Sequence, residues 1–196
     1  MDRDNQQDTA TEAEVAWLAG IIEGDGTLSL SMSCRVERAA PKVSVTVKLY
    51  NTDGFVIKKA IEILDKMGVR TYLNEREQKP MLKQGGGEYT SRDSMLTITV
   101  NKMESSHRLL ERIRPWLFGN KAARADLMTR YLIGRFDKFA KNGGYKQVAL
   151  GQDDVDTVKD FYKLTNPNKS CRMHASTSRF LNDYTRCVPE TAKDIV

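Results

Sequence analysis

Small residues recur along one face of a short apolar segment near the N-terminus, and this pattern constrains the fold more than any other. Residues 17–26 read WLAGIIEGDG. Ala16, Gly20 and Gly24 are spaced at i, i+4 and i+8, so they share one face of a helix. Such faces let two helix backbones approach closely, as in small-xxx-small helix pairs. The pattern predicts a helix that packs against another helix.

An acidic residue follows this stripe at the expected end of the helix. Thr11 and Glu14 have the spacing of a capping box, so we expect the helix to begin there and to run to about Glu23. Asp25 then lies at the helix end, and Gly26 is expected to free the turn into the segment that follows. The alternative is that Gly-Asp-Gly is only a common turn.

The segment resembles the signature of the LAGLIDADG homing endonucleases. It reads LAGIIEGDG over residues 18–26, with Glu23 at the first acidic position and Gly24 after it. The resemblance implies an α+β fold of order αββαββα with a saddle-shaped antiparallel sheet. It further implies a site-specific double-strand DNA endonuclease that hydrolyses phosphodiester bonds.

Hydrophobic periodicity predicts the same order of elements. Alternating apolar and polar residues predict strands, and apolar residues at helical spacing predict helices. After the first helix we expect a strand hairpin at 27–35 and 42–50, a helix at 53–67, strands at 69–76 and 95–101, and helices at 104–113 and 121–138. One further helix is expected at 154–164. The expected organisation is an acidic leader (1–10), an endonuclease core (11–142) and a C-terminal helical extension and tail (143–196).

The composition limits the classes of molecule that the protein is expected to bind. The net charge is +5, and residues 102–146 carry eleven Lys or Arg against four carboxylates, which favours a polyanion. Three widely spaced cysteines and two histidines predict neither a disulfide framework nor a zinc site. No apolar run approaches the roughly 18 residues of a membrane span. We expect an intracellular, non-secreted protein in a DNA-containing compartment, with no membrane partner and no small-molecule substrate.

One copy of the signature is expected. Residues 131–139 hold Leu, Gly and Asp at matching places, but too few residues follow for a second unit. The stripe of Leu127, Tyr131, Ile133 and Phe136 is better interpreted as a core-facing helix. A single copy needs a second chain to supply the second carboxylate, so we predict a symmetric homodimer that is closed by the Ala16, Gly20 and Gly24 faces.

Polar side chains alternate along the predicted strands on one face of the sheet. Such a face can enter a major groove, where cations and amides contact base edges, and a two-fold dimer would bind a long pseudo-palindromic target. The alternative is an ordinary solvated sheet. The candidate DNA-binding residues are Ser29, Ser31, Ser33, Arg35, Lys42, Ser44, Thr46, Lys48, Asn74 and Arg76.

Phosphodiester hydrolysis needs charge neutralisation and activated water, which carboxylate-held divalent ions supply. Asp25 of each chain is the predicted ligand, with the Gly24 carbonyl beside it, for Mg²⁺ or Mn²⁺. The resemblance implies two further catalytic residues, a polar residue after the second strand and a lysine before the last core helix, which match Asn51 and Lys121. Asn51 is alternatively a turn or N-cap residue, and Lys121 is alternatively a simple phosphate contact.

Two other functions stay open at this point. The same scaffold can serve as an intron RNA maturase or as a DNA-binding regulator that does not cleave. A soluble α/β protein with an accidental motif would require the glycine stripe, the strand alternation and the basic block all to be coincidences.

Overall fold

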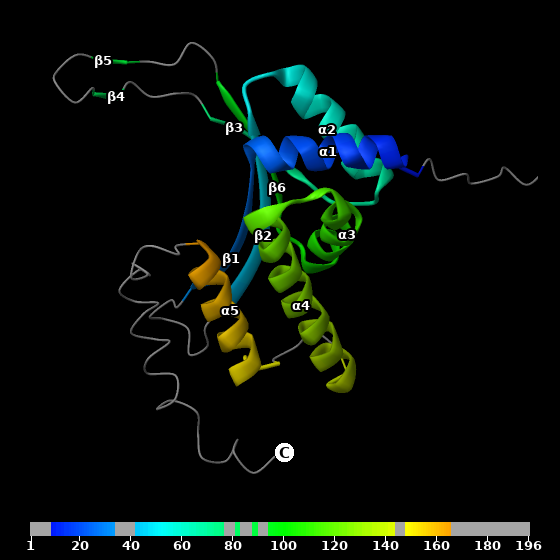
Figure 1. The fold of residues 1–196 in the computed structure, drawn as a ribbon, viewed down its shortest axis with the longest axis vertical. Coiled ribbons are helices and arrows are strands. Elements are labelled where there is room, and N and C mark those ends of the chain that lie inside the picture. The colour runs from blue at the N-terminus through cyan, green and yellow to red at the C-terminus, as the bar shows by residue number, and fades with distance from the viewer. Residues whose placement is uncertain are drawn as a thin grey trace, which may run out of the picture. The chain divides into compact units, whose positions relative to one another are not determined.

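The computed structural model describes residues 9–33, 42–76, 81–82, 88–89, 94–143 and 148–165 (Figure 1). The elements in chain order are α1 (Glu12–Asp25), β1 (Gly26–Ser33), β2 (Lys42–Asn51), α2 (Gly54–Lys66), β3 (Tyr72–Arg76), β4 (Met81–Leu82), β5 (Glu88–Tyr89), β6 (Met95–Val100), α3 (Met103–Ile113), the short 3₁₀ helix η1 (Arg114–Trp116), α4 (Gly119–Lys141) and α5 (Gln152–Thr165). The predicted α+β class and order are confirmed. The sequence did not predict the small β4–β5 hairpin between β3 and β6.

The chain divides into two compact units. One contains Met1–Ser29 and Val45–Leu132, and the other contains Leu30–Ser44 and Ile133–Val196. The expected division at residues 10 and 142 stays a prediction. None of the described helices is long and apolar enough to cross a bilayer.

Helix α1 begins with the predicted capping box. The Glu14 N–H donates to Thr11 Oγ1 at 3.3 Å, and the Thr11 N–H donates to Glu14 Oε2 at 2.9 Å. The helix ends at Asp25, two residues beyond the expected end. Gly26 has an ordinary φ of −92°, so its conformational freedom is not used. Its missing side chain is what matters, because a Cβ there would lie 2.5 Å from the Ile22 carbonyl oxygen.

We expect Glu14→Gln to lower stability at neutral pH by an amount that disappears in acid. The Thr11 N–H and the Lys66 ammonium lower the pKa of Glu14 from 4.5 to about 2. A carboxylate whose pKa is lowered on folding stabilises the protein above its unfolded pKa, and this contribution is lost as the pH falls from 4.5 to about 2. Urea unfolding of both proteins across this range measures it. A stability difference that does not change with pH would contradict the expectation.

The main sheet has the strand order β1-β2-β6-β3. Strand β6 is antiparallel to both β2 and β3, and β1 lies beside β2 as the predicted hairpin requires. Alternation places Val47, Leu49, Ile98 and Val100 on one face, where all four are buried. In the unit that holds them, α2 contacts β6, and α1 contacts both α2 and α3. Figure 1 shows these three helices gathered together.

Two apolar residues within the predicted helices are exposed, and one of them, Ile133, belongs to the stripe that was expected to face the core. Phe55 is 76% exposed and Ile133 is 46% exposed. In α2 the buried face contains Ile57, and Phe55 precedes it by two positions, which is about 200° around the helix. Ile133 is about 100° around α4 from the buried Leu132. Residues 131–139 lie within α4, which continues to Lys141, whereas α1 ends at its acidic residue Asp25; the single copy of the signature stays a prediction.

Charged residues are buried between the end of α4 and α5, within the second unit. Arg135 donates to Asp154 Oδ2 at 3.3 Å and to the carbonyls of Val148 and Ala149. Lys138 Nζ donates to the same Asp154 oxygen at 2.9 Å. The Gly151 N–H also donates to it, at 2.8 Å. Asp154 is 3% exposed, so this network fixes α5 against α4 through one desolvated carboxylate.

Candidate active site

The end of α1 and the end of β2 meet at Asp25 and Asn51, which are 26 positions apart in the chain. Asn51 Nδ2 donates to Asp25 Oδ2 at 3.0 Å. Asn51 Oδ1 accepts the Asp53 N–H at 2.8 Å, which fixes the amide so that its donor faces the carboxylate. Asp53, and not Asn51, is the N-cap of α2, where its side chain accepts the Phe55 N–H. Asn51 therefore orients Asp25.

Lys121 reaches the same helix end from the first turns of α4. Its Nζ donates to the Ile22 carbonyl at 2.8 Å and also to the Glu23 carbonyl. A cation at this position stabilises the negative end of the α1 dipole. Burial lowers the pKa of the Lys121 ammonium below its usual value, while the charges of Glu23 and Asp25 act in the opposite direction. The structure thus brings Asp25, Asn51 and Lys121 together, and their catalytic roles stay a prediction.

A second cation near this site was not predicted from the sequence. Arg124 lies one helical turn after Lys121, and its charge contributes to the lowered pKa of Lys121. Its Nε is buried and has no hydrogen-bond partner among the described residues. A buried polar atom without a partner is costly, and an anionic ligand would satisfy it. The sequence signal was the basic run in residues 121–130, which does not say which cation points inward.

The residues at the end of α1 fit a hard divalent cation. Asp25 is exposed, and it supplies carboxylate oxygen, while Gly24 supplies a carbonyl beside it in the last turn of α1. Oxygen ligands of this kind are the ones that Mg²⁺ prefers. Lys121 donates to the carbonyls of Ile22 and Glu23. The Gly24 carbonyl follows these two in the chain and is the one that we assign to the metal. Within the described part of the chain, no group of three or more His, Cys, Asp or Glu is placed to hold a metal ion.

The face of the sheet opposite the buried one, which we call the open face, is lined by two cross-strand rows in the first unit. In one row, Thr99 of the central strand β6 pairs with Lys48 of β2 and with Tyr72 of β3. In the other row, Thr97 of β6 pairs with Tyr50 and Asn74. Arg76 pairs with Met95 at the end of β3. Residues directly opposite each other point to the same side of a sheet. The predicted Lys48, Asn74 and Arg76 are therefore on one surface.

The other predicted sheet residues are placed less fully. Ser29 and Thr46 alternate with the buried Leu28 and Val45 in the first unit. Ser31, Lys42 and Ser44 lie on the strand ends that belong to the second unit, where Ser31 and Lys42 are exposed. The Ser33 side chain and Arg35 are outside the described residues.

Four further residues of β2, β3 and β6 lie on the open face and were not predicted from the sequence. They are Tyr50, Tyr72, Thr97 and Thr99. The alternation of residues 95–100 already separates Thr97 and Thr99 from Ile98 and Val100. Only the position of β6 between β2 and β3 shows that these threonines occupy the centre of the surface.

Solved structures share this fold, although no protein-family model and no curated protein sequence matches the chain. The homing endonuclease I-CvuI, solved with a DNA target in the presence of Mg, is 17% identical with a TM-score of 0.52, and the match covers 91% of this chain and 98% of that one. The group I intron-encoded I-CeuI, complexed with DNA, is 13% identical with a TM-score of 0.51, over 83% of this chain and 69% of that one.

A third solved structure is the LAGLIDADG homing endonuclease I-SmaMI bound to cleaved DNA. It is 13% identical with a TM-score of 0.54, and the match covers 90% of this chain and 49% of that one. These identities are low, so the likeness is one of fold. The resemblance of residues 18–26 and the element order that it implied are confirmed at that level. The chain therefore has the fold of the LAGLIDADG homing endonucleases.

Proposed function

We propose that this protein is a site-specific DNA endonuclease that uses a divalent metal and acts as a homodimer. The observation that carries the proposal is the carboxylate of Asp25, which is exposed at the end of a glycine-faced helix and oriented by Asn51. A protein that only binds DNA has no need of an acid held in this way. Structures with the same fold were solved with DNA, which supports the same conclusion.

In the proposed reaction, Asp25 and the Gly24 carbonyl would hold Mg²⁺ or Mn²⁺. When bound, the cation supplies positive charge at the scissile phosphate and activates water. Asn51 keeps the Asp25 carboxylate in position through its fixed amide. Lys121 and Arg124 place positive charge beside the phosphate, and the partly buried setting strengthens their effect on the charge that develops there.

The proposed dimer places the α1 helices of two copies against each other. Gly20 and Gly24 are exposed, and a Cβ at either position would have nothing within 4 Å in the single chain. Phe118, whose N–H faces the Glu23 carboxylate at 3.5 Å, is 70% exposed. An open stripe of glycines beside an exposed aromatic ring supports a helix-to-helix contact. Each copy would then bring one Asp25 to the shared centre.

We expect Gly20→Leu to convert the dimer to monomer. The isolated chain has room for the leucine, and a glycine in a helix interior is about 1 kcal/mol worse than alanine, so folding should not suffer. The larger side chain would separate two α1 backbones that need close approach. Sedimentation velocity measures the change. Gly134→Leu is the matched control, because it also alters a helical glycine with open surroundings. Unchanged sedimentation of Gly20→Leu would count against the dimer.

The open face is proposed to contact base edges. We expect Lys48→Gln to change base preference at one or two positions of the target by about 1–3 kcal/mol. Selection from a randomised duplex pool, with affinities measured for the selected sequences, gives this value. Lys58→Gln changes an exposed lysine of α2 and should leave base preference unaltered. A uniform loss of affinity over all sequences would identify Lys48 as a phosphate contact instead.

The proposed activity is tested by incubating the purified protein with a randomised duplex library and Mg²⁺, and then sequencing the cut ends. We expect paired cuts on both strands at one family of related, pseudo-palindromic sites. Selective retention of DNA without cuts, in either Mg²⁺ or Mn²⁺, would reject the endonuclease and favour a regulator. The proposed setting is an intracellular compartment that contains DNA.

A further inference from the structure

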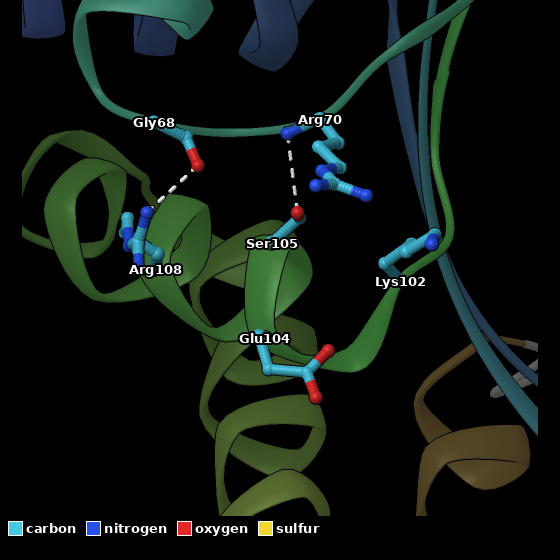
Figure 2. A pocket seen from close by; sticks show the side chains of 6 residues that line it. All are labelled: Gly68, Arg70, Lys102, Glu104, Ser105 and Arg108. Carbon is cyan, nitrogen blue, oxygen red and sulfur yellow. Dashed lines mark hydrogen bonds between the residues drawn. The ribbon is translucent and has the colours of Figure 1, made fainter.

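A cavity of about 290 Å³ lies in the first unit, between the α2–β3 connection and the start of α3 (Figure 2). It contains none of the residues of the candidate active site. Its lining residues are Gly68, Arg70, Lys102, Glu104, Ser105 and Arg108. Three of the six are cations and one is an acid, so the cavity suits an anion.

The cations differ in how they are held. Arg108 Nη1 donates to the Gly68 carbonyl at 2.7 Å, which fixes its guanidinium in the wall of the cavity. The side chains of Arg70 and Lys102 make no hydrogen bond or ion pair with the described residues. Figure 2 shows Arg70 extending from its loop towards α3, while the Glu104 carboxylate points away from it. Arg70 and Lys102 therefore have no acidic partner in the part of the chain that the structure describes.

Gly68 is required for this arrangement. Its φ is +66°, a value that favours glycine, and a Cβ there would lie 2.5 Å from Arg108 Nη1. Glycine therefore permits both the turn after α2 and the close approach of the guanidinium to the carbonyl.

A buried hydroxyl and a helix start complete the cavity. Ser105 is 6% exposed, and its Oγ accepts the Arg70 N–H at 3.1 Å. No acceptor for its own proton is present among the described residues, so the hydroxyl can donate to a ligand. Lys102 is the N-cap of α3, and it makes no side-chain capping bond. The positive end of α3 thus adds to the charge of the three cations.

We propose that this cavity is a phosphate-binding site. Arg70 and Lys102 would pair with the phosphate oxygens, Ser105 Oγ would donate a hydrogen bond, and Arg108 would supply fixed positive charge. Charge-assisted bonds of this kind to phosphate are among the stronger polar contacts in proteins. The phosphate belongs either to the backbone of a bound nucleic acid or to a small phosphate compound.

The first arm of the test is a titration of the 196-residue chain with inorganic phosphate, followed by amide ¹H–¹⁵N shifts. Sodium chloride at equal ionic strength is the reference. We expect saturable shifts of the Arg70 and Ser105 amides, weakened about tenfold by Lys102→Gln or Arg70→Gln. Both residues are exposed, so these variants should fold, and the spectra confirm it. Lys58→Gln, which removes an exposed lysine of α2, should bind phosphate as the wild type does.

Duplex DNA binding across a range of salt concentrations, without Mg²⁺, is the second arm. If the ligand is a DNA backbone phosphate, each variant should reduce the slope of log K against log salt by about 1, and Lys58→Gln should not. If the ligand is a small phosphate compound, the slope stays unchanged while the first arm saturates. Unsaturable shifts together with an unchanged slope would overturn the proposal, as would an equal effect of Lys58→Gln. Neither arm uses cleavage, so a failed nuclease assay does not affect the result.

Discussion

Asp25→Asn is expected to abolish DNA cleavage and to leave specific DNA binding intact. The change removes the charge that would hold the divalent cation, and cleavage should fall by more than about 100-fold, since changes around metal ligands alone often cost 10–100-fold. The fold should be retained, because the amide oxygen of an asparagine can still accept the Asn51 Nδ2 hydrogen bond seen at 3.0 Å. Cleavage under single-turnover conditions and binding in Ca²⁺ measure the two properties separately.

The matched control is Asp65→Asn, which removes an exposed carboxylate from the last turn of α2. The neighbouring Lys66 binds Glu14 at the start of α1, whereas Asp25 is at the other end of that helix. It should cleave as the wild type does. Cleavage by Asp25→Asn at the normal rate would reject the metal assignment. Loss of both binding and cleavage would instead indicate that Asp25 positions the DNA.

Asp154→Ala is expected to destabilise the second unit by about 3–5 kcal/mol, because it leaves the buried Arg135 without its carboxylate. Arg135 is 7% exposed. Among the described residues it would keep the carbonyls of Val148 and Ala149 and the face of Phe139, whose ring centre is 4.9 Å from the guanidinium carbon. The Gly151 N–H would also lose its acceptor. Hydrogen exchange of the α5 amides measures the loss, and it does not require the two units to unfold together.

The neighbouring residue provides the control for this variant. Asp153 also pairs with Lys138, at 2.8 Å, but its side chain is 68% exposed. Burial acts to lower the pKa of Lys138, yet its hydrogen bonds to Asp153 and Asp154 outweigh burial and raise that pKa. Because an exposed ion pair contributes at most about 1 kcal/mol, Asp153→Ala should have a small effect. Equal effects of the two variants would show that burial of Asp154 does not set its importance.

Much of the fold was predictable because its elements leave local marks. The Thr11–Glu14 capping box marked the start of α1, and alternation in residues 42–50 marked β2 within one residue of its observed end. The exposed Phe55 shows the limit of such reasoning, since an apolar run is consistent with several helical faces, and packing against the sheet selects one of them. The β4–β5 hairpin left no pattern, because two-residue strands are too short to show a period.

Some residues of the candidate site were likewise predictable from local sequence patterns, and others were not. The glycine stripe and the acid at its end were visible in the sequence, whereas Asn51 and Lys121 came from the resemblance to a family. The turn alternative for Asn51 proved compatible with the functional one, since the two ends of its amide serve Asp53 and Asp25 at once. Arg124 was indistinguishable from its basic neighbours until burial of its Nε singled it out.

The sequence by itself determined the helices and the four strands of the main sheet, because caps, glycine spacing and hydrophobic period act over a few residues. Only the tertiary structure decided which elements meet: β6 between β2 and β3, Asn51 against Asp25, and the α2–β3 connection against the start of α3. Asn51 and Asp25 are 26 positions apart in the chain, and Arg70 and Ser105 are 35 positions apart. Their formation depends on burying one shared core, and no local pattern encodes that choice.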